Sequence, residues 1–369
     1  MNGEKSKKLL CFKFNQDYSC FVCSNEQGFG IYSCNPYEKI YNNNIGGGLR
    51  IIEMYYRSNI MAFIGGGINP KYPHTKITLW NDEQKKMTGE LCFKLKVVGV
   101  RIRKDMLVAV LERDVYVYNY NDFDLLETFA TVENTNGCCD LTGVGPAILA
   151  IPDKNHGRLI IKNYETKEKF TPIANKHGIA AIALNRDGKL CAVGSKKGTL
   201  IRIFTTSNGN LLQEVRRGKD PANITSIAFD STSSWFACTS NKGTVHIFSV
   251  ISPSKAAVII SEQERSEQQL EEKGSDEEDN EEEKKVHMKN RISRFRFVGG
   301  IIPYFKSEWS VAQFRITEKN TVVGFGPPET NTIIVLTSTG KYYVAEYDPV
   351  NGGECKKIDE KVIEMPKVE

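Results

Sequence analysis

The stretch IALNRDGKLCAVGSKKGTLIRIF, residues 182–204, returns in altered form as IAFDSTSSWFACTSNKGTVHIF, residues 227–248. Each copy is an apolar run, a polar turn and a second apolar run. At an offset of 45 residues the following positions coincide: Ile182 and Ile227, Ser195 and Ser240, Gly198 and Gly243, Thr199 and Thr244. A strand–turn–strand unit that recurs every 40–45 residues is typical of a β-propeller, in which each unit forms one four-stranded blade.

The rest of the chain continues this pattern. Short runs such as LLCFKFN, GFGIYSC and MLVAVLE alternate with turns rich in Gly and Asn, and fainter copies of the repeat lie at residues 24–34 and 336–347. Long amphipathic helical patterns are absent outside one acidic insert. Dividing residues 8–365 by the repeat, with one insert allowed, predicts seven blades. We therefore expect an all-β, WD40-like seven-bladed β-propeller that forms a single domain over residues 1–369.

One long loop interrupts predicted blade six. It spans residues 252–300, between the third strand GTVHIFSV and the fourth strand WSVAQFRI. Its central part, residues 262–283, holds twelve acidic residues against two basic ones, and so carries a net charge of −10. Such a stretch has too little apolar content to fold alone, and we expect it to be largely disordered. Because the whole chain carries +4, the remainder carries +14, which favours an anionic partner: lipid headgroups, nucleic acid or acidic protein tails.

The sequence gives little support to an enzyme or a metal protein. It contains no G-x-S-x-G or H-E-x-x-H motif, its five histidines are dispersed, and its triple-glycine runs lack the Gly-Lys-Ser/Thr ending of a phosphate-binding P-loop. Cys20 and Cys23 form a C-x-x-C, but on a strand a separation of three places them on opposite faces. We interpret the ten cysteines as reduced core thiols of a cytosolic protein, and expect no catalysis, cofactor or metal.

The segment LLQEVRRGKD, residues 211–220, ends the last strand of predicted blade five. Arg216 and Arg217 are neighbours on a strand, so their side chains point in opposite directions, and we expect both to project from the rim into separate pockets. Hydroxyl groups from the two repeat copies flank each pocket. Arginine forks, hydroxyls and backbone N–H groups exposed at glycine suit a multiply phosphorylated ring. An Arg-Arg pair in a surface turn can also be only solvated charge.

The motif Val215-Arg216-Arg217-Gly218 resembles the Phe/Leu-Arg-Arg-Gly hallmark of the PROPPIN family, the phosphoinositide-binding propellers of autophagy whose human members are the WIPI proteins. The flanking GSKKGTLIRIF and SNKGTVHIF resemble the family's two blade signatures. Further similar segments are residues 15–24, 65–73 and 303–310 and the closing GKYYVAEYDPVNGGEC. The nearest subgroup is the shorter WIPI proteins with Leu-Arg-Arg-Gly. Val215 departs from the hallmark, and we expect it to pack inward.

The resemblance implies two shallow rim sites for phosphatidylinositol 3-phosphate and phosphatidylinositol 3,5-bisphosphate. Carried over by position, the first site comprises Ser195, Gly198, Thr199, Arg202 and Arg216, with His177 as a further contact. The second site comprises Arg217, Gly218, Ser240, Thr244 and His246. The family often has Ser or Thr where this chain has Val193, so the first site is expected to lack one hydroxyl.

The resemblance also implies a membrane contact and a protein contact. The family uses the blade-six loop as a membrane probe, and we expect its acidic stretch to stay in solvent while flanking apolar residues insert, with Ile301, Ile302 and Phe305 as candidates. An autophagic lipid-transfer protein is the implied partner, docking on blades one to three. Asn15 and Asp17 are candidates for that contact, although Asp17 could instead simply cap a β-turn.

These features predict a monomeric, cytoplasmic adaptor attached peripherally to preautophagosomal, endosomal or vacuolar-type membranes, where it recruits autophagy machinery. Two other functions are alternatives. A WD-repeat scaffold that binds only proteins would make the arginine pair incidental. A nucleic-acid binder would require a basic stripe interleaved with aromatic residues, whereas the bases here cluster beside hydroxyls, so nucleic acid is not expected as a partner.

Overall fold

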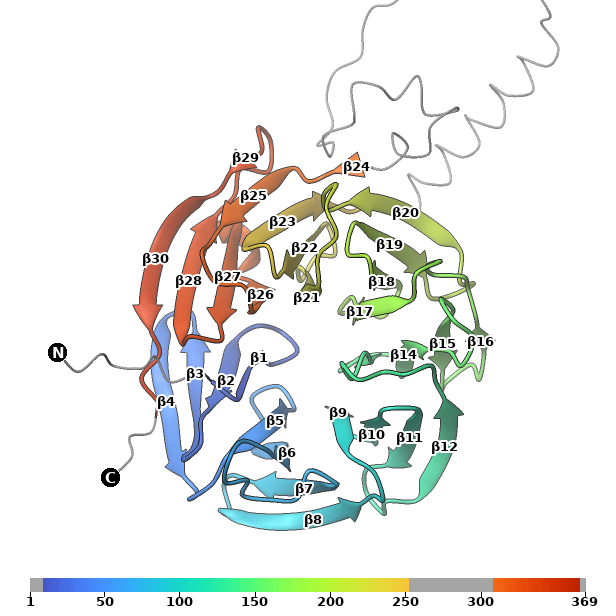
Figure 1. Ribbon diagram of the computed structural model, residues 1–369, viewed down its shortest axis with the longest axis vertical. Helices are drawn as coiled ribbons and strands as arrows, with labels where there is room; N and C mark the ends of the chain where they lie inside the picture. The colour runs from blue at the N-terminus through green and yellow to red at the C-terminus, as the bar shows by residue number, and fades with distance from the viewer. Residues whose placement is uncertain (1–8, 252–307, 366–369) are drawn as a thin grey trace, which may run out of the picture.

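Seven sheets, each built on four antiparallel strands, are arranged in a ring around a common centre (Figure 1). This computed structural model describes residues 9–251 and 308–365. In each sheet the four main strands pair side by side in the order in which they occur in the sequence. The predicted all-β, seven-bladed propeller is therefore confirmed. The acidic stretch 262–283 and the insertion candidates Ile301, Ile302 and Phe305 lie outside the described residues.

The first four blades are built from the following strands. Blade one contains β1 (Cys11–Phe14), β2 (Cys20–Ser24), β3 (Gly28–Cys34) and β4 (Tyr37–Asn44). Blade two contains β5 (Leu49–Met54), β6 (Ile60–Gly65), β7 (Lys76–Asn81) and β8 (Lys86–Cys92). Blade three contains β9 (Val97–Ile102), β10 (Met106–Leu111), β11 (Asp114–Asn119) and β12 (Leu125–Ala130). Blade four contains β13 (Asp140–Leu141), β14 (Ile148–Pro152), β15 (Leu159–Asn163) and β16 (Lys169–Phe170).

The last three blades include two short additional strands. Blade five contains β17 (Ile179–Leu184), β18 (Leu190–Ser195), β19 (Leu200–Thr205) and β20 (Leu211–Arg216), to which β24 (Glu308–Trp309) is added. Blade six contains β21 (Ile224–Phe229), β22 (Trp235–Ser240), β23 (Thr244–Ser249) and β25 (Ala312–Arg315), to which β29 (Gly353–Glu354) is added. Blade seven contains β26 (Thr321–Phe325), β27 (Thr332–Thr337), β28 (Lys341–Glu346) and β30 (Lys356–Val362), with a short 3-10 helix, η3 (Pro328–Thr330), before β27.

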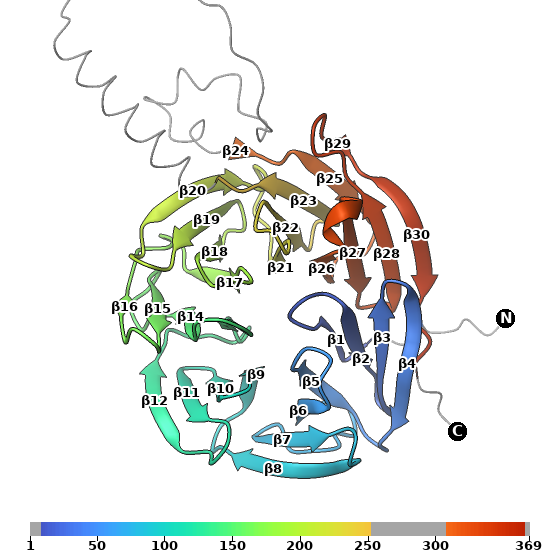
Figure 2. The same ribbon diagram turned by 180° about the vertical axis from the view of Figure 1, so that it is seen from behind.

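The sequence of each strand follows its place in the blade. The first strands line the centre of the ring and the fourth strands lie toward its rim, as both faces of the ring show (Figures 1 and 2). Second strands such as β10 (MLVAVL) are buried at every position because neighbouring blades cover both faces. Fourth strands such as β8 (KMTGELC) are mostly exposed and mix polar with apolar residues. An apolar second strand and a more polar, exposed fourth strand are what this arrangement favours.

Seven hydrophobic clusters hold the ring together, one between each pair of neighbouring blades. Alternate side chains of a strand enter different clusters because successive residues point to opposite faces. Cys20 packs between blades one and two, whereas Cys23 packs between blades seven and one. All ten cysteines are free thiols and nine are buried, which confirms their interpretation as mainly core residues. Among the described residues, no helix has the length and apolarity to cross a membrane.

The stretch WSVAQFRI does not form one blade-six strand as predicted. Trp309 belongs to β24, which pairs in parallel with β20 of blade five, and only Ala312–Arg315 pairs with β23 of blade six. Ser310 and Val311 connect the two blades. The physical reason is that the rim strand of blade five has free backbone N–H and C=O groups, which the chain meets before it enters blade six.

Candidate functional site

The residues of the two predicted lipid sites gather where one blade joins the next. We call these places junctions and define each by a linker, a turn and one strand residue. Junction 4/5 comprises linker 171–178, turn 195–199 and Arg202; junction 5/6 comprises linker 217–223, turn 240–244 and His246; junction 6/7 comprises linker 316–320, turn 337–341 and Tyr343. The structure thus brings Ser195, Gly198, Thr199, Arg202 and His177 of the predicted first site together at junction 4/5 and the predicted residues of the second at junction 5/6, whereas Arg216 of the first site lies at the end of β20, paired with Leu200.

The serine hydroxyls of the two sites form hydrogen bonds within their own turns. Ser195 Oγ donates to the Leu200 carbonyl at 3.1 Å and accepts from Gly198 N at 3.2 Å. Gly198 has φ +70°, and a Cβ there would lie 1.7 Å from a backbone oxygen, so the turn requires glycine. Ser240 Oγ accepts from Lys242 N at 3.4 Å. Both serines are buried, and their hydroxyls are partly used by the turns that they form.

Arg202 is anchored on both sides at junction 4/5. Its Nε and one Nη approach Glu214 Oε2 at 2.8 Å, across the β19–β20 pair. Its other Nη donates to the carbonyl of Ala174, in the linker, at 2.8 Å. The charge of Arg202 is therefore compensated within the fold. His177 lies exposed in the same linker.

The arginine pair is buried, which corrects the expectation that both side chains project from the rim. Arg216 is 9% exposed and Arg217 is 5% exposed. Arg217 is turned onto the carbonyls of Gly198 and Asp220. At Arg216, β20 is not the free edge of its sheet, since Trp309 of β24 pairs beside this residue. Sequence reasoning could not place that strand, because it arrives from a distant part of the chain.

Arg217 occupies the boundary between the two predicted sites. Its backbone N–H donates to the Thr199 carbonyl at 2.9 Å and its Nε to the Gly198 carbonyl at 2.8 Å, while a further guanidinium N–H donates to the carbonyl of Asp220. Its charge acts on His246 across junction 5/6. Burial lowers the pKa of Arg217, but the group stays a cation at neutral pH. Among the described residues, no carboxylate lies within ion-pair distance of it.

His246 is a neutral polar group in this environment. Its ring is 8% exposed, and its Nδ1 lies 3.2 Å from Ser310 Oγ. Ser310 also accepts a hydrogen bond from Gln313 at 3.0 Å. Burial, and secondarily the charge of Arg217, lowers the pKa of His246 to about 4. At neutral pH His246 can therefore contribute a hydrogen bond to an anion but no charge.

Three polar residues of these junctions were missed by the sequence analysis. Glu214 neutralises Arg202, and Ser310 holds His246. Asn175 follows the carbonyl that holds Arg202; it is 4% exposed, and its Nδ2 has no hydrogen-bond partner among the described residues. The offset of 45 could have indicated none of the three. Glu214 could have been found as the cross-strand partner of Arg202, but nothing in the sequence marks Ser310 or Asn175.

The remaining predicted residues are placed as follows. Val215 is fully buried between blades five and six, as expected, and Val193 is buried opposite Arg202. Gly218 is partly exposed, and a Cβ there would meet nothing within 4 Å. Thr199 is buried and Thr244 is partly buried in the two turns.

Asn15 and Asp17 lie apart from the junctions, in the β1–β2 turn that lines a central cavity of about 630 Å³. Asn15 is buried, with Nδ2 donating to Ser19 Oγ at 3.0 Å and Oδ1 accepting from Cys20 N at 3.2 Å. Asp17 is exposed, and its Oδ1 accepts from Ser19 N at 3.1 Å. Both side chains therefore stabilise this turn, and Asp17 alone is at the surface. No group of three metal-ligating side chains is found in residues 9–251 and 308–365.

The fold and the junctions define a β-propeller with paired polar turns beside an arginine dipeptide. Residues 8–258 match the family model described as PROPPIN. The chain is 31% identical to autophagy-related protein 18e of Arabidopsis thaliana over 361 residues, which cover 96% of this chain and 87% of that protein. The chain therefore belongs to the PROPPIN family, and its relatives include autophagy-related β-propellers.

Solved structures show the same fold at low sequence identity. Hsv2 of Kluyveromyces lactis matches with a TM-score of 0.73 and 20% identity, covering 97% of this chain and 99% of that one. KlAtg21, solved in complex with the coiled coil of AgAtg16, matches with a TM-score of 0.70 and 21% identity, covering 97% and 100%. The β-propeller of this family is a binding fold rather than a catalytic one. The subgroup with Leu-Arg-Arg-Gly stays a prediction.

Proposed function

We propose that this chain is a peripheral membrane adaptor that binds phosphatidylinositol 3-phosphate and phosphatidylinositol 3,5-bisphosphate at junctions 4/5 and 5/6. The observation that carries the proposal is the environment of Arg217. Its hydrogen bonds run to carbonyl oxygens rather than to a carboxylate, the Asp220 carboxylate acts on it only from beyond ion-pair distance, and one Nη has no partner among the described residues. A buried cation beside two hydroxyl-bearing turns is suited to a phosphate monoester.

The two junctions differ in the charge that they offer. At junction 4/5 Arg202 is already paired with Glu214, so Arg216 is the proposed source of attraction for a headgroup there. At junction 5/6 Arg217 supplies the charge, and neutral His246 supplies a hydrogen bond. Two modest sites on one rigid ring would bind two lipids of the same membrane, so that the second binds at a high effective concentration.

Recruitment of autophagy machinery is the proposed consequence of membrane binding. Membership in the PROPPIN family supports it, as does KlAtg21, a structural neighbour solved together with a coiled-coil protein. The proposed partner is an autophagic lipid-transfer protein docking on blades one to three, where Asp17 offers a surface contact. The proposed setting is the cytoplasmic surface of preautophagosomal, endosomal or vacuolar-type membranes, with the chain acting as a monomer.

Liposome flotation across the phosphoinositide series tests this function. Arg216→Thr with Arg217→Thr should abolish flotation with 3-phosphorylated lipids, because each lost charge-assisted hydrogen bond costs about 1.5–3 kcal/mol. Since both arginines are buried, thermal unfolding must show that the variant is still folded. Arg113→Thr with Lys104→Thr is the matched control, as it removes two exposed cations from blade three. Flotation of the folded double variant at the wild-type level would refute the proposal and favour a scaffold that binds only proteins.

A further inference from the structure

Junction 6/7 repeats the turn of junction 5/6. Ser240 and Thr337 end their second strands, and Thr337 Oγ1 accepts from Lys341 N at 3.0 Å. The glycines of the two turns, Gly243 and Gly340, have φ values of +72° and +80°. Blade seven therefore carries a third copy of the hydroxyl-glycine turn.

The strand that follows each turn also places a polar ring against the preceding linker. In β23 this is His246, which pairs with Cys238 and interacts with Arg217. In β28 it is Tyr343, which pairs with Val335. Its hydroxyl donates to Glu318 Oε1 at 3.2 Å. The two junctions thus match in turn, register and strand residue.

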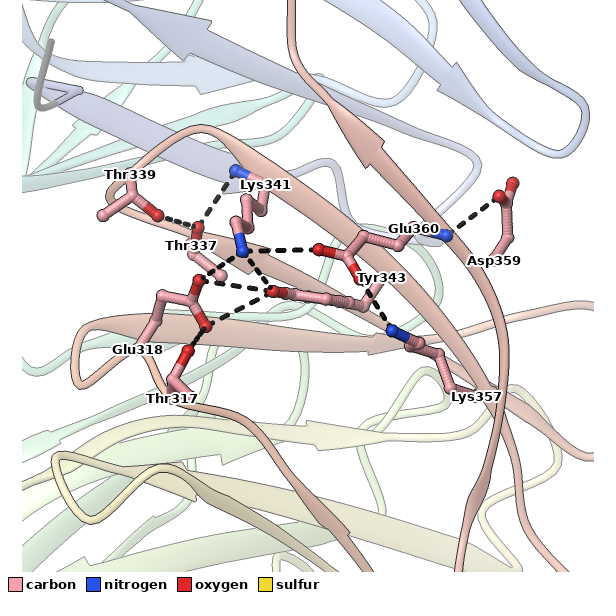
Figure 3. A network of polar contacts seen from close by, with 9 residues as sticks. All are labelled: Thr317, Glu318, Thr337, Thr339, Lys341, Tyr343, Lys357, Asp359 and Glu360. Carbon is pink, nitrogen blue, oxygen red and sulfur yellow. Dashed lines mark hydrogen bonds and ion pairs between the residues drawn. The ribbon is translucent and has the colours of Figure 1, made fainter. Parts of the chain in front are cut away.

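The linkers differ in the sign of their charge. Where linker 217–223 supplies Arg217, linker 316–320 supplies Glu318, whose side chain is only 9% exposed. Three donors surround its carboxylate: the ammonium of Lys341 at 3.2 Å, the hydroxyl of Tyr343, and the hydroxyl of Thr317 at 3.0 Å (Figure 3). Ammonium and hydroxyl groups are also the donors that a phosphate monoester takes.

The charges around this carboxylate cancel. Lys341 also lies 3.3 Å from Glu360, which in turn lies 2.7 Å from Lys357 (Figure 3). Burial would raise the pKa of Glu318, but hydrogen bonds from Thr317 and Lys341 hold it below its usual range, so the side chain is an anion at neutral pH. Two cations therefore face two anions, and loss of Glu318 leaves one positive charge in excess.

We propose that junction 6/7 is a third anion site of this propeller, occupied by the chain's own carboxylate. Glu318 takes the place that a phosphate monoester takes at the other two junctions, and so it limits the ring to two lipids. The comparison with those two junctions rests on the proposed function. The chemistry of junction 6/7 rests only on the donors that surround Glu318.

The test removes the internal anion in a protein whose other two sites are disabled. Glu318→Ala is introduced together with Arg216→Thr and Arg217→Thr, and binding of inorganic phosphate and of soluble dibutanoyl phosphatidylinositol 3-phosphate is measured by calorimetry and native mass spectrometry. The expected result is one bound anion per chain, against none for the parent double variant. If the variant binds inorganic phosphate but not the soluble lipid, junction 6/7 is a site for free phosphate. If it binds the soluble lipid, junction 6/7 is a headgroup site.

Two controls separate a site from a general gain of positive charge. Glu354→Ala removes an exposed carboxylate of blade six, one that lies 3.7 Å from Arg315, and should not add an anion. Lys341→Met in the Glu318→Ala protein should abolish the gained binding, because the central donor is lost. If Glu318→Ala does not fold, Glu318→Ser keeps a hydroxyl for Lys341 and replaces it.

The inference is overturned if a folded Glu318 variant binds neither probe, or if Glu354→Ala gains as much binding. Failure of the proposed function has a different signature. In that case the unmodified chain binds no lipid, yet the Glu318 variant still gains one phosphate.

Discussion

Acid should destabilise the folded chain through His246. Burial and the neighbouring Arg217 lower the pKa of this imidazole from 6.5 to about 4. The unfolded chain binds a proton at His246 near pH 6.5, whereas the folded chain does so only near pH 4. Stability linked to this residue is therefore fully present above about pH 6.5 and is lost as the pH falls toward 4.

The size of the effect follows from the shift. At about 1.4 kcal/mol per pKa unit, the difference between 6.5 and about 4 corresponds to roughly 3 kcal/mol of the free energy of unfolding. The charge of Arg217 contributes to the shift, so the loss should be smaller in an Arg217→Thr background. Because the imidazole is only 8% exposed, solvent screening reduces the effect little.

Urea unfolding at pH 7 and at pH 4 measures this linkage. Between the two pH values the unmodified chain should lose about 3 kcal/mol more stability than His246→Gln does. His177→Gln is the control, since that imidazole is exposed in a linker, and this variant should keep the pH dependence of the unmodified chain. Equal pH dependence in His246→Gln and the unmodified chain would mean that the folded state protonates His246 as readily as the unfolded state, which refutes the reasoning.

Three further predictions concern the turns and the acidic loop. Gly198→Ala should lower the free energy of unfolding by at least about 1–2 kcal/mol, since φ there is +70°, whereas Gly218→Ala should change it little; equal effects in chemical denaturation would contradict this. Asn15→Ala should lower the free energy of unfolding by about 1–3 kcal/mol, because its turn hydrogen bonds are lost, and Asp17→Ala should lower it much less. A partner pull-down that fails only for a destabilised Asn15 variant would therefore not identify a contact. Deleting residues 262–283 should preserve or strengthen liposome flotation and reduce its salt dependence, because a charge of −10 is removed; loss of flotation by the folded deletion protein would exclude the role of a solvated spacer.

The fold could be predicted because inter-blade packing imposes its period on the sequence. Each blade must cover both faces of its second strand, so every repeat carries an apolar run there, as Met106–Leu111 and Leu190–Ser195 do. The separation between Cys20 and Cys23 was sufficient to assign them to different faces, and they enter different clusters. Packing of this kind is set by the position of a residue within its own repeat, and it can therefore be predicted from the sequence.

The candidate site was predicted less completely because its environment is built from distant segments. The offset of 45 located both turns, but it did not show that β19 begins at Leu200, after Thr199, whereas β23 begins at Thr244 itself. Nor could it show that Trp309 pairs beside Arg216 and helps to bury it. Both features depend on where the chain enters a sheet, which the period does not determine.

The three junctions indicate which part of a blade is free to acquire function. Strand residues are constrained by the cluster on each side, and the turns by a left-handed glycine, such as Gly198. The linkers are where the junctions differ most: a carbonyl from Ala174, a guanidinium from Arg217 and a carboxylate from Glu318. The same turn is thus presented with a neutral acceptor, a cation or an anion. In the proposed function, the attraction for a phosphate comes from Arg217 of the linker at junction 5/6 and from Arg216 at the end of β20 at junction 4/5, while the turns supply the common hydrogen-bonding frame.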